Sequence, residues 1–158
     1  MTLFGVVDMS APVARRLLQW ASEGATVLVE SGATFGDEAE FLEHRDSLAR
    51  LGVDVAAPRT LWPRPRGGIP YVEYHWPVAA SVRDYSRVIP VLPRPGDEVI
   101  AQVDGIPAAV RRRVGHGMLV VLGSPIAGAI ALEDPEARRW MHALEREAGT
   151  FSSVVSSR

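Results

Sequence analysis

The chain has 158 residues, a formal net charge of -2 and no cysteine. A chain of this length can bury a core of its own without help from a disulfide or a metal. The absence of cysteine excludes disulfides, thiolate metal sites and a cysteine nucleophile. The small negative charge provides no general attraction to nucleic acid or to an anionic membrane.

No apolar run approaches the roughly 20 residues of a membrane span, and no basic segment precedes an apolar one at the start of the sequence. We therefore expect a cytoplasmic protein that does not bind membranes or nucleic acid. We expect one domain over residues 1–150 and a mobile tail over residues 151–158. No motif predicts a cofactor.

The N-terminal part alternates between strand and helix patterns. Residues 4–8 predict a short strand, and Ser10 with Pro12 predicts the start of a helix that ends at Gly24. The apolar stripe of this helix comprises Val13, Leu17, Trp20 and Ala21.

The most informative segment is the strand predicted over residues 26–30. Val27, Leu28 and Val29 follow one another without polar alternation, which is typical of a strand covered on both faces. A second helix follows, with Asp37 and Glu40 as a capping box. Its apolar side carries Phe41, His44, Leu48 and Leu51, and a third short strand begins at Val53 and Val55. This alternation predicts a parallel α/β sheet.

The middle of the chain has a different character. Eight prolines between Pro58 and Pro95 argue against long helices and central strands. The same region holds five of the chain's aromatic residues, so we expect an ordered functional or interface loop. These aromatics are Trp62, Tyr71, Tyr74, Trp76 and Tyr85.

The C-terminal part predicts β-hairpins followed by a helix. Asp104-Gly105 is a strong two-residue hairpin signal between apolar runs, and Gly115-His116-Gly117 predicts a second tight turn. The apolar run 118–122 predicts an interior strand. Asp134 and Pro135 predict the start of a last helix, with Gly149 beyond its end, and the sheet is therefore mixed.

Three pieces of the chain in this order resemble the class I glutamine amidotransferase-like superfamily. They are the strand with its leading glycine at residues 24–29, the stretch from Gly115 to Ser124, and the helix opened by Asp134. The pattern is most similar to the non-catalytic branch typified by the β-galactosidase trimerisation domain. The resemblance implies a three-layer, flavodoxin-like α/β domain with a mixed, largely parallel sheet and a C-terminal β-hairpin region.

The resemblance also implies limits on function. Catalytic members carry a cysteine elbow and a distal His-x-Glu pair, and this sequence has neither, so amidotransfer by that mechanism is excluded. Family domains have further strand–helix units ahead of the strand that residues 4–8 resemble. An open strand edge would remain here, and proteins avoid this by covering or pairing it. We therefore expect a homo-oligomer or a partner protein.

The candidate ligand site lies at the end of strand 26–30, where Glu30, Ser31 and Gly32 follow the apolar run. A serine nucleophile needs small residues two positions before and after it; Ala33 fits this pattern and Val29 does not. Ser31 is better explained as a residue of the turn that hydrogen-bonds backbone amides. Glu30 is a candidate site carboxylate, and the alternative is an acid bonded to nearby loop amides.

Other polar residues have structural explanations that we favour. His44 lies on an apolar helix side and is expected to be satisfied at the margin of the core. Glu73 and His75 share a face of an extended run, but no third metal ligand lies at a diagnostic spacing. The basic run 111–113 alternates across a strand and forms no single patch. We expect no metal site and no catalytic residue.

Tyr74, His75 and Trp76 complete the candidate ligand site, because aromatic side chains stack on planar or sugar ligands and also anchor interfaces. A small core beneath the loop remains an equal alternative. We predict a non-enzymatic domain that acts as an oligomerisation or partner-binding module. The alternative is a protein that binds or hydrolyses a small molecule, a sugar or a carboxylate, in a pocket at the end of strand 26–30.

Overall fold

The computed structural model describes residues 2–6, 9–31, 35, 37–61, 68, 70–84 and 87–155, without the side chains of residues 2–6 and 150–155. The helices are α1 (Ala11–Ser22), α2 (Glu38–Ala49), α3 (Ala127–Ala131) and α4 (Pro135–Val155). The N-terminal and middle strands are β1 (Thr2–Val6), β2 (Thr26–Ser31), β3 (Asp54–Val55), β4 (Arg59–Thr60), β5 (Tyr71–Tyr74) and β6 (Ala80–Arg83). The remaining strands are β7 (Arg87–Val88), β8 (Val91–Leu92), β9 (Glu98–Val103), β10 (Ile106–Val114) and β11 (Gly117–Leu122).

The main sheet has seven strands in the order β1-β2-β11-β10-β9-β5-β6. Only the pairs β1–β2 and β2–β11 are parallel, and the other pairs are antiparallel. The prediction of a mixed sheet with hairpins near the C-terminus is confirmed. The prediction of a largely parallel sheet is wrong, and the flavodoxin-like arrangement is not confirmed.

The correction has an identifiable cause in the third predicted strand. Val55 is the second residue of the two-residue strand β3, which Val53 precedes, and β3 pairs with β8 in a small separate sheet. Hairpins from the second half of the chain occupy the place where further parallel strands were expected. A hairpin needs only a two-residue turn, whereas a parallel pair needs a crossover of a dozen or more residues.

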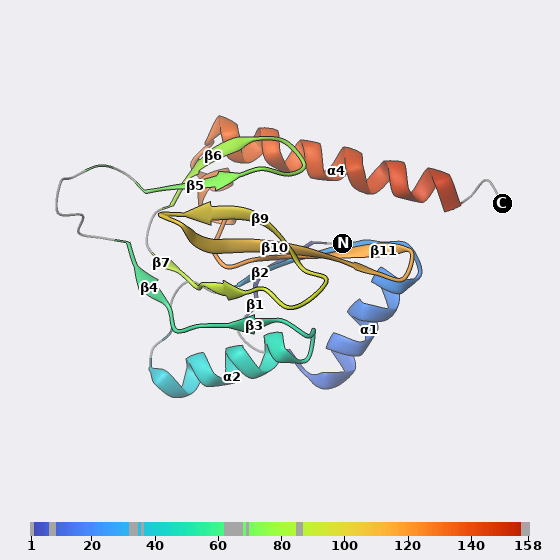
Figure 1. Ribbon diagram of the computed structural model, residues 1–158, viewed down its shortest axis with the longest axis horizontal. Coiled ribbons are helices and arrows are strands. Elements are labelled where there is room, and N and C mark those ends of the chain that lie inside the picture. Colours follow the sequence, from blue (N-terminus) through green and yellow to red (C-terminus); the bar gives the residue numbers. More distant parts are fainter. Residues whose placement is uncertain are drawn as a thin grey trace.

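Strand β2 lies inside the sheet between β1 and β11, and its residues from Val27 to Ser31 are all buried. Leu28 packs in one hydrophobic cluster, while Val27 and Val29 pack in another, because successive side chains point to opposite faces. Figure 1 shows α4 on one side of the sheet and α1 with α2 on the other. The prediction of a strand covered on both faces is confirmed.

The helices begin close to their predicted starts. Asp37 caps α2 by accepting a hydrogen bond from the Glu40 backbone N–H at 2.9 Å. In α1 the buried side chains are Ala14, Leu17 and Ala21, and the predicted stripe is wrong at Val13, which is 47% exposed. Helix α4 continues through Gly149 to Val155, so the predicted end before Gly149 is also wrong.

The proline-rich segment contains strands where we expected a loop. Strand β5 lies between β9 and β6 in the main sheet. Tyr74 is buried, with its ring centroid 4.6 Å from that of the fully buried Trp140 of α4. The Trp140 indole N–H donates to the Trp76 carbonyl at 2.8 Å. Trp62 and Tyr85 lie outside the described residues. Tyr74 therefore packs between β5 and α4, and the Trp76 backbone carbonyl joins the segment after β5 to the same helix.

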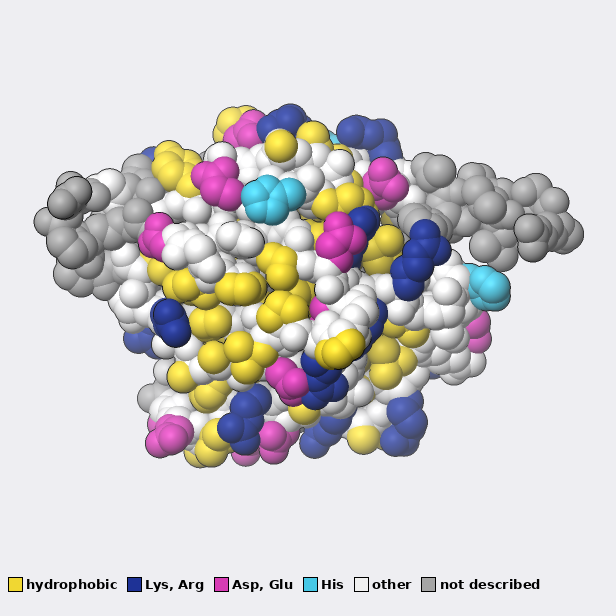
Figure 2. Space-filling model, in the orientation of Figure 1, with side chains coloured by type: hydrophobic (Ala, Val, Ile, Leu, Met, Phe, Trp, Pro, Cys, Tyr) yellow, Lys and Arg dark blue, Asp and Glu magenta, His cyan; other side chains and the backbone are white. Residues whose placement is uncertain are grey.

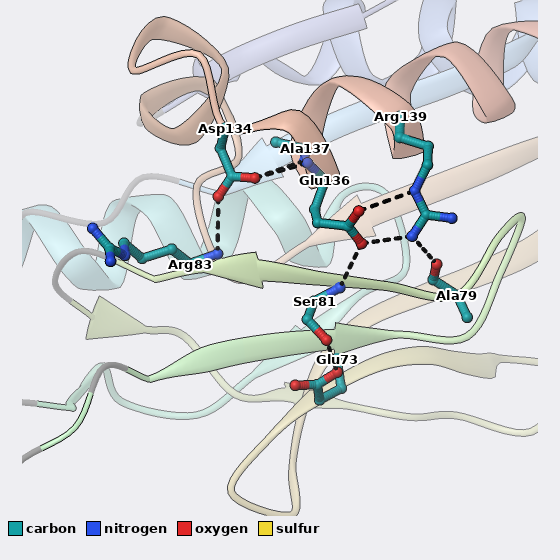
Figure 3. A network of polar contacts seen from close by, with 8 residues as sticks. All are labelled: Glu73, Ala79, Ser81, Arg83, Asp134, Glu136, Ala137 and Arg139. Carbon is teal, nitrogen blue, oxygen red and sulfur yellow. Dashed lines mark hydrogen bonds and ion pairs between the residues drawn. The ribbon is translucent and has the colours of Figure 1, made fainter.

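Helix α4 also covers the outer edge of β6, which is the last strand of the main sheet (Figure 3). The backbone N–H of Ser81 donates to Glu136 and that of Arg83 donates to Asp134, both at 3.4 Å. Arg139 donates to the Ala79 carbonyl at 2.6 Å and pairs with Glu136. Helix carboxylates thus occupy the N–H groups with which another strand would pair.

No helix in the described ranges is long and apolar enough to cross a membrane. The predicted first strand appears as β1, shifted toward the N-terminus, with residues 7 and 8 outside the description. The strands on either side of Asp104-Gly105 pair as predicted, with Val103 opposite Ile106. Both turn residues have positive φ, 50° and 76°, as a type I′ turn requires.

We predict that replacing Gly117 with alanine strongly destabilises the fold. A Cβ atom at Gly117 would lie 2.2 Å from the Ala25 carbonyl oxygen and 2.3 Å from that of Ala21, so β11 and the end of α1 must separate. We expect the free energy of unfolding in urea to fall by about 3 kcal/mol. Gly128→Ala is the matched control, because nothing lies within 4 Å of its Cβ position and alanine favours helix. Equal stability of the two variants would contradict this packing.

Candidate functional site

Buried polar side chains gather near the carboxyl ends of β2 and β11. Most come from segments that meet there: β2, the buried side of α2, the residue after β6, and the turn after β11. Among the described residues, the buried polar side chains are Glu30, Ser31, His44, Ser47, Asp84 and Ser124. This is the edge at which sequence analysis predicted a site.

Ser31 and His44 form the shortest link between β2 and α2. The distance from Ser31 Oγ to His44 Nε2 is 2.6 Å, and the residues are 1% and 0% exposed. The ring of Phe35 lies 5.1 Å from that of His44, between centroids. The expectation of a satisfied histidine is confirmed, and His44 lies fully within the core. This arrangement holds α2 against the sheet and also places an imidazole beside a hydroxyl.

Glu30 faces the other side of the sheet and connects β2 to α3. Its Oε1 accepts a hydrogen bond from the Ala127 backbone N–H at 2.9 Å. Burial raises the pKa of the Glu30 carboxyl, and hydrogen bonds from the backbone N–H groups of Ala127 and Ile126 partly offset that increase. The carboxyl is thus bonded to backbone amides, as the alternative expected, but these amides lie at the start of α3 and not in a loop next to Glu30.

Two buried acids, Glu30 and Asp84, influence the pKa of the buried Tyr74 hydroxyl. Burial raises the pKa of Tyr74 well above its ordinary value, and the negative charges of Glu30 and Asp84 raise it further. Asp84 Oδ2 accepts a hydrogen bond from the Ser124 hydroxyl at 2.5 Å. The hydroxyl of Tyr74 therefore stays protonated.

The five predicted ligand-site residues that the structure describes do not share one pocket lining. Glu30 and Ser31 point to opposite faces of β2, toward α3 and α2 respectively. His75 is exposed, and its backbone N–H donates to the Ile100 carbonyl at 2.8 Å. Trp76 is partly buried against the guanidinium of Arg111, 4.3 Å from its ring centroid. Gly32 lies outside the described residues.

Some of the residues gathered here could not be identified from the sequence. The apolar helix pattern predicts His44 as a core residue, and only the packing of α2 against β2 shows that its ring reaches Ser31. Asp84 follows β6, a strand that was not predicted because prolines surround it. Ser124 was noted only as the last residue of the stretch from Gly115 to Ser124. No group of three or more potential metal ligands occurs within the described ranges.

We predict that Glu30→Gln changes how stability depends on pH. Because the pKa of the folded carboxyl lies above its ordinary value, wild-type stability falls as the pH rises from the ordinary pKa through the raised one. Glutamine has no such titration. The difference in unfolding free energy, variant minus wild type, should therefore increase between pH 4 and 7 in urea titrations.

Glu43→Gln, exposed on α2, controls for the change in net charge. A pH dependence no larger for Glu30→Gln than for Glu43→Gln would show that burial does not perturb the Glu30 carboxyl.

Comparisons with known proteins identify relatives of the fold only. No known family matches the sequence, and no curated protein matches it. A β-galactosidase from Rahnella sp. R3 aligns over 92% of this chain with a TM-score of 0.67 and 13% identity. A β-galactosidase from the haloarchaeon Halorubrum lacusprofundi aligns over 94% with a TM-score of 0.61 and 20% identity. The chain covers 22% of each of those two proteins.

A cytoplasmic protein from Salmonella typhimurium LT2 also aligns, over 89% of this chain and 59% of that one, with a TM-score of 0.56 and 18% identity. Identities this low establish shared architecture and nothing about activity. The expected likeness to a β-galactosidase domain is supported at the level of fold: this chain has an architecture that also occurs as a segment of β-galactosidases.

Proposed function

We propose that this chain is a non-catalytic domain that associates with a second copy of itself or with another protein. The observation that carries the proposal is that the polar groups at the strand ends are buried and engaged internally. Glu30 accepts from Ala127, Ser31 bonds His44, and Ser124 donates to Asp84. Groups held in this way stabilise the fold and are not presented to a substrate.

The comparisons support the same proposal. The fold recurs as about a fifth of two β-galactosidase chains, covering 22% of each. A domain of that size, carried in a larger enzyme, suits a role in assembly. The resemblance of the sequence to the class I glutamine amidotransferase-like superfamily, and to the branch of the β-galactosidase trimerisation domain, motivates the same assignment.

The two edges of the main sheet suggest where association occurs. The outer edge of β6 is covered by Asp134, Glu136 and Arg139 of the α4 region. On the outer side of β1, no strand pairs within the described residues. Two copies that pair through β1 in antiparallel fashion form a two-fold dimer. One covered edge then limits growth to a closed pair, whereas two open edges would favour an open-ended polymer.

We predict self-association at high micromolar concentration. Light scattering coupled to size exclusion should give a mass that rises from monomer to dimer with loading concentration. Hydrogen exchange at the same concentrations should show increasing protection of β1 amides and unchanged protection of β6 amides. A monodisperse monomer at every concentration would remove self-association, and concentration-dependent protection of β6 would place the contact at the wrong edge.

A second candidate function, ester hydrolysis, is favoured by one observation, the 2.6 Å contact between Ser31 Oγ and His44 Nε2. In that function Ser31 Oγ attacks the carbonyl carbon of an ester while His44 accepts the hydroxyl proton. The proton then passes to the leaving alkoxide, and water hydrolyses the acyl-serine. The burial of both side chains weighs against this function, because a substrate must reach the Oγ atom.

An active-site-directed fluorophosphonate separates the two candidates. Under the first function we expect no labelling of the wild-type protein above that of Ser31→Ala. Under the second, intact-mass analysis should show one adduct that Ser31→Ala removes and Ser124→Ala retains. Ser124 is the matched control because its hydroxyl is equally buried but bonded to a carboxylate. Labelling lost in Ser31→Ala alone would overturn the non-catalytic assignment.

A further inference from the structure

We infer that a groove beside α2 binds a small organic anion, a monocarboxylate with an aliphatic or aromatic body. The α2 groove, as we name it, lies between the outer side of α2 and the segment 55–60, with Arg87 of β7 at its wall. Its volume of about 670 Å³ lies within the range of small-molecule sites. The inference goes beyond the proposed association function and does not depend on it.

The lining of the α2 groove is largely apolar. Phe41 and Leu42 of α2 face Pro58 and the adjoining alanines across it. Leu42 is 37% exposed, and Phe35 packs edge-on against Phe41 with centroids 5.5 Å apart. Figure 2 shows hydrophobic side chains at the lower left of the molecule, over α2 and β3, with basic side chains nearby. A hydrocarbon body that covers these groups is removed from water, which favours binding.

The groove also contains a cation, Arg87, for which the described residues provide no partner. Arg87 is half-buried and lines the groove, and no ion pair or hydrogen bond engages its side chain among the described residues. Other arginines near the middle strands are paired: Arg94 with Asp54 at 2.5 Å and Arg111 with Glu98 at 2.6 Å. A partly desolvated guanidinium gains a charge-assisted bidentate contact when a carboxylate binds.

The remaining charges select a monoanion. Besides Arg87, the groove is lined by Arg45, which lies 3.7 Å from the Asp46 carboxylate, and by the acids Asp37 and Glu38. Asp37 is occupied in capping α2. Two cations and two acids give a lining with no excess charge, so a polyanion such as a phosphate ester is repelled by the acids. One carboxylate is enough to pair with Arg87.

The test uses octanoate and 4-phenylbutyrate as probes, with octanamide and 4-phenylbutyramide as uncharged matches, in titrations followed by calorimetry and by amide chemical shifts. We expect each carboxylate to bind about tenfold or more tightly than its amide. Shift changes should concentrate at residues 41–45 and 55–58. Arg87→Gln should abolish the preference for the carboxylate.

Arg59→Gln is the matched control: Arg59 is exposed on β4, which pairs with β7, but does not line the groove. It should bind the probes as the wild type does. Leu42→Glu, an exposed helix position, places a negative charge in the groove and should also abolish carboxylate binding, even if Arg87→Gln proves unstable. Equal affinity for acid and amide, or wild-type affinity in Arg87→Gln or Leu42→Glu, would overturn the inference. Self-association is measured separately, so either proposal fails without the other.

Discussion

The parallel pairing of β2 with β11 is the constraint on which the rest of the structure depends. Thr26 lies opposite Met118 and Glu30 opposite Leu122, so the N-terminal strand–helix–strand unit and the C-terminal hairpins become one sheet at this seam. Both strands are buried on both faces. The seam requires the end of α1 to approach β11 closely, and Gly117 permits this because it has no Cβ atom to meet the Ala21 and Ala25 carbonyls. At the other end of β11, Gly123 likewise permits a close approach, because a Cβ atom there would meet the Ile89 carbonyl.

This explains which parts of the fold were predictable from the sequence. Val27, Leu28 and Val29 predicted a covered strand because their burial is a local property of an unalternating run. Asp104-Gly105 predicted a hairpin because the turn needs two residues with positive φ. The neighbours of β2 were not predictable, since a strand pattern does not encode its partner. Strands β5 and β6 are four residues long and lie near prolines, so pairing, not local preference, creates them.

The candidate site likewise has parts that were predictable from the sequence and parts that were not. Alternation along β2 follows from the sequence, and it sends Glu30 to α3 and Ser31 to α2, so the two residues cannot line one pocket from the same face. Which groups they meet is tertiary information: Ser31 meets His44, from a helix face that also carries apolar residues, and Glu30 meets the Ala127 backbone N–H at the start of α3. That Arg87 has no partner among the described residues is likewise visible only in the folded structure.

Burial separates the charged groups that stabilise the fold, such as Glu30, from those that can bind a ligand, such as Arg87. A buried carboxyl such as Glu30 costs free energy unless it is hydrogen-bonded, and backbone N–H groups of the Ile126–Ala127 segment meet that need. The Glu30 carboxyl therefore serves to join β2 to α3. Arg87 is placed where water is partly removed and where apolar side chains of α2 leave room beside it. In this fold the polar groups at the strand ends hold the elements together, so the groups free to bind a ligand lie at the side of the sheet, in the α2 groove.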